Sequence, residues 1–216
     1  AFAAGNYRGI HLTSILSKLA ERIRSRNLIA HLHCGKFGPH QWAFTPGLSA
    51  RDLVTSLIMA WILAVCTGNK ITIYLGDISS AFDRVFTDYL LAKLQAAGVG
   101  SQYLNFLEAY LQPRAGTVVV EGVCSEEFQL ANTVFQGTVV GPPLWNVFFS
   151  DVTHCISTER PALFADDLTE FQQFKRIEEN ESIKRHMHVC RTRVHKWGRA
   201  NRVAFDPTKE HVVVIH

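Results

Sequence analysis

The sequence predicts an α+β fold in which an antiparallel sheet packs on helices. Its strand-like and helical segments follow one another without the regular β-α-β alternation that builds parallel sheets. Two short apolar runs, 162–164 and 168–171, flank an Asp-Asp turn, as in an antiparallel hairpin. With 216 residues, of which 47% are hydrophobic and 19% charged, the chain is long enough for one or two globular domains.

The first third of the chain predicts two helices and a buried strand. Apolar residues recur at helical spacing over residues 12–23, which predicts the first helix. An S-x-x-D start signal at 49–52 opens a second helix, and Gly68 ends it. The β-branched run 71–75 then predicts a buried strand.

The rest of the chain predicts further helices and short strands. The expected helices are 87–97, 101–111, 143–156 and 183–197. The last of them carries an apolar stripe with steps of four and three residues: Ile183, Met187, Cys190, Val194 and Trp197. Residues 117–120 and 128–130 predict a hairpin around Glu121-Gly122, and 203–205 and 212–215 predict short strands.

Charge is unevenly distributed along the chain. The net charge is +3, but residues 1–70 hold eight Lys or Arg against two acidic residues, a balance of +6, so the remainder carries −3. A basic lobe beside an acidic one suits a protein that grips phosphates on one side and holds a metal on the other. We expect the basic segment to contact nucleic acid.

The cysteines and the apolar runs indicate where the protein works. The five cysteines are scattered without a C-x-x-C pair, which favours a reducing compartment over a disulfide framework. The sequence begins without a secretory leader pattern, and the longest apolar run, 57–66, is shorter than the ~20 residues that cross a bilayer. We therefore expect an intracellular protein, nuclear or cytoplasmic, that is not secreted and uses no membrane.

Histidines and cysteines gather twice along the chain. The two groups are His31, His33, Cys34 and His40, and His186, His188, Cys190 and His195. Neither has the closed spacing of a zinc finger. We expect polar surface, or a phosphate-contacting loop for the first group, and no metal.

Carboxylates carry the chemistry that the sequence predicts. Asp77 ends the predicted strand, and Asp166-Asp167 forms the hairpin turn. Mg²⁺ prefers carboxylate oxygens, and two such ions about 4 Å apart can activate an attacking hydroxyl and stabilise a leaving oxygen. Taken alone, the same residues also suit a capping Asp and a polar turn.

The sequence around these carboxylates resembles the reverse transcriptase family, especially its non-LTR retrotransposon and group II intron branch. Six segments follow the family's motif order across nearly the whole chain: 6–22, 41–49, 77–83, 136–146, 164–167 and 203–210. They are similar to the family patterns YRPISLTS, QxGFRPGRS, the first palm motif, QGCPLSPLLFN, YADD and NxxKTE. The resemblance implies an α+β polymerase palm with helical fingers and an RNA-directed DNA polymerase activity.

Site roles follow from the resemblance. Asp77, Asp166 and Asp167 would hold catalytic Mg²⁺, with Mn²⁺ as a substitute, and Lys209 would act near the leaving pyrophosphate. Phe82 would lie under the incoming sugar and exclude a 2′-hydroxyl.

The resemblance also implies contacts with template and nucleotide. Gln136 and Gly137 would contact the templating pair, and Arg8 or Arg51 would bind the triphosphate or template. The implied partners are an RNA template, a DNA or RNA primer and a dNTP. Residues 1–70 would form the fingers and 71–216 the palm, with finger contributions inside it. We expect a segment of a longer polyprotein whose thumb and other domains lie elsewhere.

Departures from the family pattern keep two alternatives open. Thr45 and Leu48 stand where the fingers loop usually carries Arg, and Val139 and Gly141 replace the usual Pro and Ser. These changes favour an inactive remnant that binds nucleic acid or a protein partner, whereas the three aspartates oppose it. An RNA-dependent RNA polymerase is opposed by Phe82, since that family usually places a carboxylate there.

Overall fold

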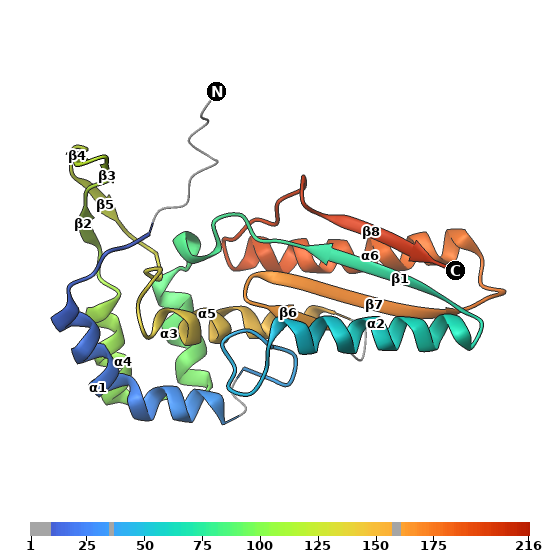
Figure 1. The fold of residues 1–216 in the computed structure, drawn as a ribbon, viewed down its shortest axis with the longest axis horizontal. Helices are drawn as coiled ribbons and strands as arrows, with labels where there is room; N and C mark the ends of the chain where they lie inside the picture. The colour runs from blue at the N-terminus through green and yellow to red at the C-terminus, as the bar shows by residue number, and fades with distance from the viewer. Residues whose placement is uncertain (1–9, 35–36, 157–160) are drawn as a thin grey trace.

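A four-stranded antiparallel sheet forms one end of the molecule (Figure 1). The computed structural model describes residues 10–34, 37–156 and 161–216. The strand order is β6-β7-β1-β8, with these bounds: β6 Ala162–Phe164, β7 Asp167–Lys175, β1 Asn69–Gly76 and β8 His211–Ile215. The α+β class and the antiparallel sheet expected from the sequence are confirmed.

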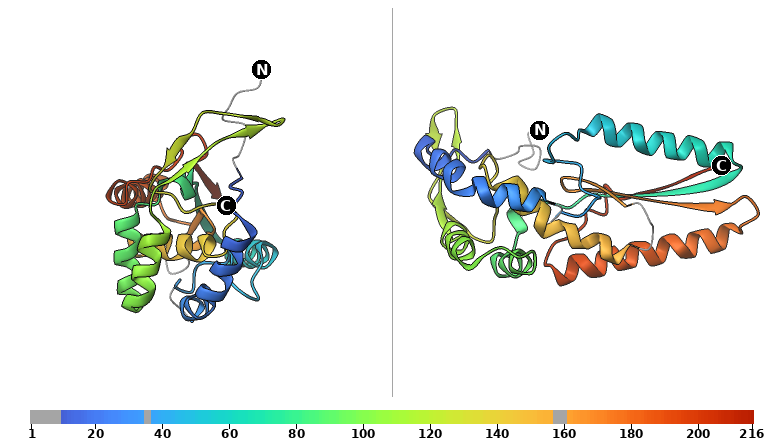
Figure 2. Two further views of the ribbon diagram at one scale, coloured as in Figure 1. Left: turned by 90° about the vertical axis from the view of Figure 1, so that its left-hand side faces the viewer. Right: turned by 90° about the horizontal axis from the view of Figure 1, so that it is seen from below.

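Helices cover both faces of this sheet. The alternation of strand β1 sends Ile71 and Ile73 into a small core with α2 (Ala50–Cys66), while Tyr74 joins the main core with α6 (Asn180–Ala200). Figure 2 shows the sheet lying between these two helices. Asp77 follows the strand at its carboxyl end, beyond the residues on which α2 packs.

Helix α2 begins and ends where the sequence predicts. Ser49 and Asp52 form a reciprocal capping box, in which each side chain accepts from the other residue's backbone N–H. Thr67 closes the last turn, and Gly68 follows with φ of +77°, a left-handed conformation that glycine adopts without strain.

The main core is centred on α5 (Gly141–Ser150) and α6. Trp145 and Phe149 are fully buried and stack on each other with ring centroids 5.4 Å apart, and Trp197 of α6 packs edge-on against Phe149 at 5.5 Å. The whole predicted stripe of α6 is buried, as its period requires.

The other end of the molecule holds helices and a projecting arm made of two two-stranded sheets, β2-β5 at its base and β3-β4 at its tip (Figure 1). Its helices are α1 (Ile15–His33), α3 (Thr87–Ala96) and α4 (Ser101–Tyr110). Its strands are β2 (Arg114–Gly116), β3 (Val119–Val120), β4 (Val123–Cys124) and β5 (Phe128–Leu130).

Several predicted elements differ from the structure. The hairpin around Glu121-Gly122 pairs β3 with β4, whereas 128–130 pairs with β2, because Arg114–Gly116 supplies the complementary extended segment. Helix α5 ends at Ser150, and a 3₁₀ helix, η3 (Asp151–Cys155), replaces its last turn. Residues 203–205 form no strand; Phe205 makes a single bridge to Ile78.

Helix α1 exposes the residues that predicted it. Ser14 caps its start, but the apolar residues of its first half point to solvent in this chain. They are Ile15, Leu16, Leu19 and Ile23, each more than half exposed, as is Leu12 just before the helix. The buried side of the helix instead carries Glu21, Ser25, Leu28 and Leu32. Within the described ranges, no helix combines the length and apolarity that a bilayer crossing requires.

Candidate active site

The carboxylates singled out in the sequence come from adjacent strand ends. Asp77 directly follows β1, and the turn at Asp166 leads into β7, which begins at Asp167. The register pairs Gly76 with Leu168, so the next step along the two antiparallel strands brings Asp77 opposite Asp167. Directly opposite side chains share a face of a sheet. If the alternation of β1 and β7 continues by one residue, both carboxylates share the face opposite buried Leu168.

The turn before these aspartates has an unusual backbone. Ala165 adopts φ of +55°, a left-handed conformation that costs a residue with a Cβ about 1–2 kcal/mol. Its N–H donates to Gln41 Oε1 at 3.2 Å, and its carbonyl accepts from Gln41 Nε2 at 3.3 Å. The indole Nε1 of Trp145 also donates to that carbonyl, at 2.9 Å.

Lys209 lies beside the first carboxylate. Its Nζ is 2.5 Å from Asp77 Oδ2. The same loop is tied to the strand end by the Asp206 N–H, which donates to the Asp77 carbonyl at 2.9 Å. Hydrogen bonds from Thr208 hold the pKa of Asp206 below its usual value. The lysine predicted to act in catalysis is thus brought to the predicted carboxylate.

Glu210, the residue after Lys209, holds the end of the loop 206–209 against β1 and α6. Its side chain is only 5% exposed and accepts from the Tyr74 hydroxyl at 2.8 Å and from Arg191 Nε at 2.9 Å. His195 Nε2 lies 2.6 Å from Glu210 Oε1, the oxygen that also accepts from the Tyr74 hydroxyl. Burial raises the pKa of Tyr74, which keeps its hydroxyl a donor. These contacts fix the residue next to Lys209.

The donor types fit a hard divalent cation. Asp77, Asp166 and Asp167 supply carboxylate oxygens, the ligands that Mg²⁺ prefers. Over the described ranges, no three His, Cys, Asp or Glu side chains gather tightly enough to form a metal cluster. Asp77 is instead paired with the Lys209 ammonium group.

Phe82 lies in η2 (Ala81–Arg84), shortly after Asp77. Its ring stacks on Trp145 at 5.5 Å with an interplanar angle of 25°, and the side chain is half-buried. Its carbonyl accepts from the Val134 N–H at 2.8 Å and from the Thr133 hydroxyl at 3.1 Å. The ring thus packs on the core, and the residue as a whole keeps part of its surface accessible.

The Gln136-Gly137 segment meets the start of the described chain. The Gln136 N–H donates to His11 Nδ1 at 3.1 Å. Gly137 has φ of +83°, and a Cβ there would lie 3.3 Å from the His11 carbonyl. A left-handed backbone and a close approach both favour glycine at this position. The approaching backbone in this structure is the chain's own.

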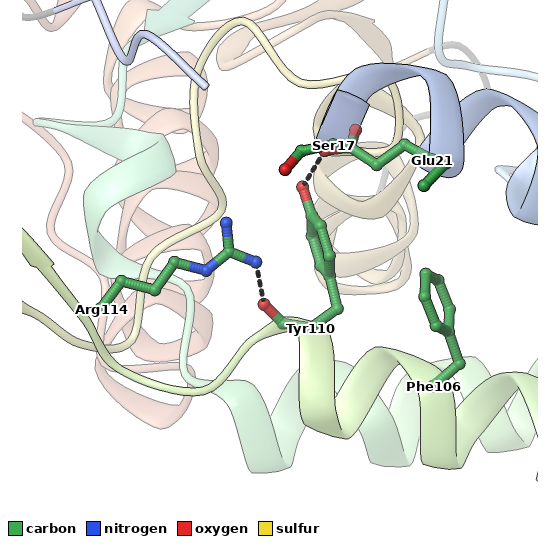
Figure 3. A pocket seen from close by; sticks show the side chains of 6 residues that line it. Ser17, Glu21, Phe106, Tyr110 and Arg114 are labelled. Carbon is green, nitrogen blue, oxygen red and sulfur yellow. Dashed lines mark hydrogen bonds between the residues drawn. The ribbon is translucent and has the colours of Figure 1, made fainter. Parts of the chain in front are cut away.

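Buried Glu21 connects α1, α4 and this segment. Its Oε2 accepts from the Val139 N–H at 2.8 Å, and its Oε1 accepts from the Tyr110 hydroxyl at 3.1 Å. Burial raises the pKa of Tyr110 to about 12, so it remains a donor at neutral pH. The adjoining cavity of about 230 Å³ is lined by Ser17, Ala20, Glu21, Phe106, Tyr110 and Arg114. Figure 3 shows the side chains around it.

The predicted cationic contacts are only partly visible. Arg8 lies outside the described residues, whereas Arg51 is exposed in the first turn of α2. Leu48, at a position where the family usually has Arg, is also exposed, and the Thr45 hydroxyl donates to the Gln41 carbonyl at 3.1 Å. The Thr45 side chain therefore stabilises the loop 41–49 through a local hydrogen bond.

The two histidine and cysteine groups have ordinary structural contacts. The His33 ring packs edge-on against Phe37 at 5.1 Å, and His31 Nε2 lies 3.2 Å from the Ala97 carbonyl. The Cys190 thiol donates to the buried Glu170 carboxylate. Burial raises the pKa of the Cys190 thiol and that of the Glu170 carboxyl.

Sequence reasoning missed the roles of Gln41, Trp145 and Glu210. All three lie inside the matched segments, so the motif strings contain them. What identifies them in the structure is their burial and their contacts with the carboxylate turn and the Lys209 loop. A polar side chain in the loop before α2 gives no sign in the sequence that it reaches the β6–β7 turn.

The family model and the related proteins that match this chain are all described as reverse transcriptases or RNA-directed DNA polymerases. Residues 3–214 match the family model described as "Reverse transcriptase (RNA-dependent DNA polymerase)". The chain is 32% identical over 171 residues to a protein of Drosophila melanogaster named "Probable RNA-directed DNA polymerase from transposon BS", covering 76% of this chain and 19% of that protein. It is 37% identical over 108 residues to "RNA-directed DNA polymerase from mobile element jockey" of the same organism, covering 47% of this chain and 12% of that protein.

Solved structures share the fold at low sequence identity. Apo telomerase from Candida tropicalis matches with a TM-score of 0.62 and 9% identity over 95% of this chain and 45% of that chain. Telomerase from Candida albicans, in complex with a fragment of telomeric RNA, matches with a TM-score of 0.55 and 14% identity over 94% of this chain and 34% of that chain. The chain spans about a fifth of the length of the transposon relative.

Proposed function

The chain belongs to the reverse transcriptase family, and from that premise we propose that it carries the polymerase centre of a retroelement RNA-directed DNA polymerase. The reaction joins a dNTP to the 3′-hydroxyl of a primer and releases pyrophosphate. The observation that supports this proposal is the strand register, which pairs Gly76 with Leu168 and so leaves Asp77 and Asp167 at adjoining ends of β1 and β7.

Reverse transcriptases use divalent metal ions, and we assign Mg²⁺ to Asp77, Asp166 and Asp167, with Mn²⁺ as a substitute. A bound ion supplies Lewis-acid stabilisation of phosphate oxygens and lowers the pKa of the attacking hydroxyl. The protein's own contribution is to hold three carboxylates on adjoining strand ends. Lys209, paired with Asp77, supplies a cation beside the leaving pyrophosphate.

The nucleotide and nucleic acid would lie against the same face. Phe82 would contact the sugar through the accessible part of the residue, because its ring is held on Trp145. Gln136 and Gly137 would meet the templating pair, and Arg51 the phosphates. The proposed partners are an RNA template, a DNA or RNA primer and a dNTP; residues 1–70 would form the fingers and 71–216 most of the palm.

The test is primer extension on an RNA template with Mg²⁺ and dNTPs. Asp166→Asn should lower the rate by roughly three decades or more, since metal ligation supplies several kcal/mol and each 1.36 kcal/mol is a factor of ten. Asp88→Asn, the same change at an exposed position on α3, should extend primers like the parent. Extension by Asp166→Asn at the parent rate would refute the assignment.

A further inference from the structure

The carboxylate turn is held by two buried side chains from elsewhere in the fold. We propose that Gln41 and Trp145 are positioning residues, here called the Ala165 clamp, that keep Asp166 and Asp167 in their metal-holding geometry. This inference rests on the proposed function of the carboxylates. It assigns roles to one residue of the fingers loop and one of α5.

Gln41 pairs with the Ala165 backbone through both ends of its amide. Its Oε1 accepts the Ala165 N–H and its Nε2 donates to the Ala165 carbonyl, so donor and acceptor are matched as in a pair of antiparallel peptide groups. The side chain is buried, with the residue 2% exposed, and its Oε1 also accepts the Ala43 N–H at 3.0 Å. A buried amide with its hydrogen bonds made is costly to displace.

The backbone around Gln41 aligns this amide with the hairpin. The Trp42 N–H donates to the Leu163 carbonyl at 2.9 Å, and the Leu163 N–H donates to the His40 carbonyl at 2.8 Å. The fingers loop thereby bridges to β6 in parallel orientation. Beyond that short ladder, the Gln41 side chain reaches Ala165, two residues after Leu163.

Trp145, from α5, is the second residue of the Ala165 clamp. Its indole N–H donates to the Ala165 carbonyl, and its ring is fully buried between Phe82 and Phe149. Two aromatic stacks therefore fix the direction in which the donor points. Because the same indole stacks on Phe82, the carboxylate turn and the proposed sugar contact share one rigid support.

The clamp matters because Ala165 is left-handed without being glycine. An L residue with a Cβ disfavours that conformation by about five- to thirtyfold, so without external hydrogen bonds the turn should populate other conformations. Asp166 follows directly in the two-residue turn, and Asp167 begins β7 opposite Phe164, so the conformation of Ala165 and the strand pairing together set the directions of the two aspartates. A glycine at 165 would adopt positive φ freely.

The experiment uses the 216-residue chain and two readouts apart from catalysis. Hydrogen exchange, followed by mass spectrometry, reports the amide of Ala165. Mn²⁺ binding, followed by electron paramagnetic resonance, reports the site whose signal is lost in Asp166→Asn. The variants are Gln41→Leu, Trp145→Phe, which keeps a stacking ring without the donor, and Gln41→Leu combined with Ala165→Gly.

Gln41→Leu should speed exchange in the hairpin peptide and weaken Mn²⁺ binding by about five- to thirtyfold, because apparent affinity falls with the population of the competent turn. Trp145→Phe should shift both readouts in the same direction. Adding Ala165→Gly should recover most of the affinity. Gln95→Leu, the same change at an exposed position of α3, should alter neither readout.

Two results would overturn the clamp. One is Mn²⁺ affinity and exchange in Gln41→Leu equal to those of the parent. The other is faster exchange throughout the chain with no recovery from Ala165→Gly, which indicates general loss of packing. A parent chain that binds no Mn²⁺ would instead overturn the metal assignment, and the exchange of Ala165 would still decide the clamp.

Discussion

Truncation of Phe82 separates a sugar-selecting residue from an ordinary core aromatic. Its ring stacks on Trp145 at 5.5 Å and is half-buried, so removing it forfeits one aromatic contact and part of a buried side chain. Fully buried Phe→Ala changes cost about 3–5 kcal/mol. Because Phe82 is only half-buried, we expect a loss of roughly 2 kcal/mol in the free energy of unfolding, with the fold retained.

The effect on sugar choice should be independent of that loss. A 2′-hydroxyl pressed against the ring gives up water without gaining a partner, which costs about 1–3 kcal/mol. Phe82→Ala should therefore lower the ratio of kcat/KM for dNTP over NTP by about 5- to 150-fold. The assay is single-nucleotide extension on an RNA template, with a chain that extends a primer.

Phe86→Ala provides a matched control for this measurement. Phe86 is also half-buried, but it packs on Tyr89 at 5.6 Å and under the Arg202 guanidinium at 4.0 Å. This variant should lose stability without changing the nucleotide ratio. An unchanged ratio in Phe82→Ala would refute the sugar contact, and a parent that prefers ribonucleotides would refute the reverse transcriptase assignment itself.

Two further predictions concern charge. Replacing Arg22, Arg24 and Arg26 of α1 by Gln should weaken RNA binding. The slope of log affinity against log salt concentration, measured by fluorescence anisotropy, should become shallower by about 0.7–0.9 per lost phosphate contact. Equal slopes for the variant and the parent would exclude α1 from the interface. Glu170→Gln should raise the free energy of unfolding at neutral pH, because burial raises the pKa of this carboxyl above its unfolded value of 4.5. The folded state then favours the protonated acid, so wild-type stability is fullest below that unfolded pKa and falls as pH rises through the folded pKa, at no more than about 1.4 kcal/mol per pH unit. The stability advantage of the Glu170→Gln variant, followed by urea titrations from about pH 4 to 8, should shrink on acidification; an advantage constant with pH would contradict the burial argument.

The sequence predicted elements whose signals are local. The capping box at Ser49 and the period of α6 both rest on residues a few positions apart, and both are found in the structure. The pairing of the hairpin strands was harder to predict, since residues 128–130 pair with β2 rather than with the predicted segment 117–120. That choice depends on which extended segments meet in space.

The same division applies to the site. The aspartates were recognisable because their flanking strands and turn are continuous in sequence. The contacts of Gln41 and Glu210 join segments more than a hundred residues apart, so no local pattern indicates them. Helix α1 forms as its apolar spacing predicts, but the face that it buries depends on what packs against it, and the predicted apolar stripe is exposed.

The strand register has a consequence for which insertions and deletions the chain can survive. The β3–β4 tip at Glu121-Gly122 is exposed, and lengthening such a loop adds only about 0.6 kcal/mol per doubling of its length. Removing one residue from β1 is a different matter, because strand side chains alternate and every later one would change face. Asp77 would then turn away from Asp167 even if the sheet re-formed. The length of the chain can therefore change at the β3–β4 tip, whereas the spacing from Lys70 to Asp77 cannot change by a single residue.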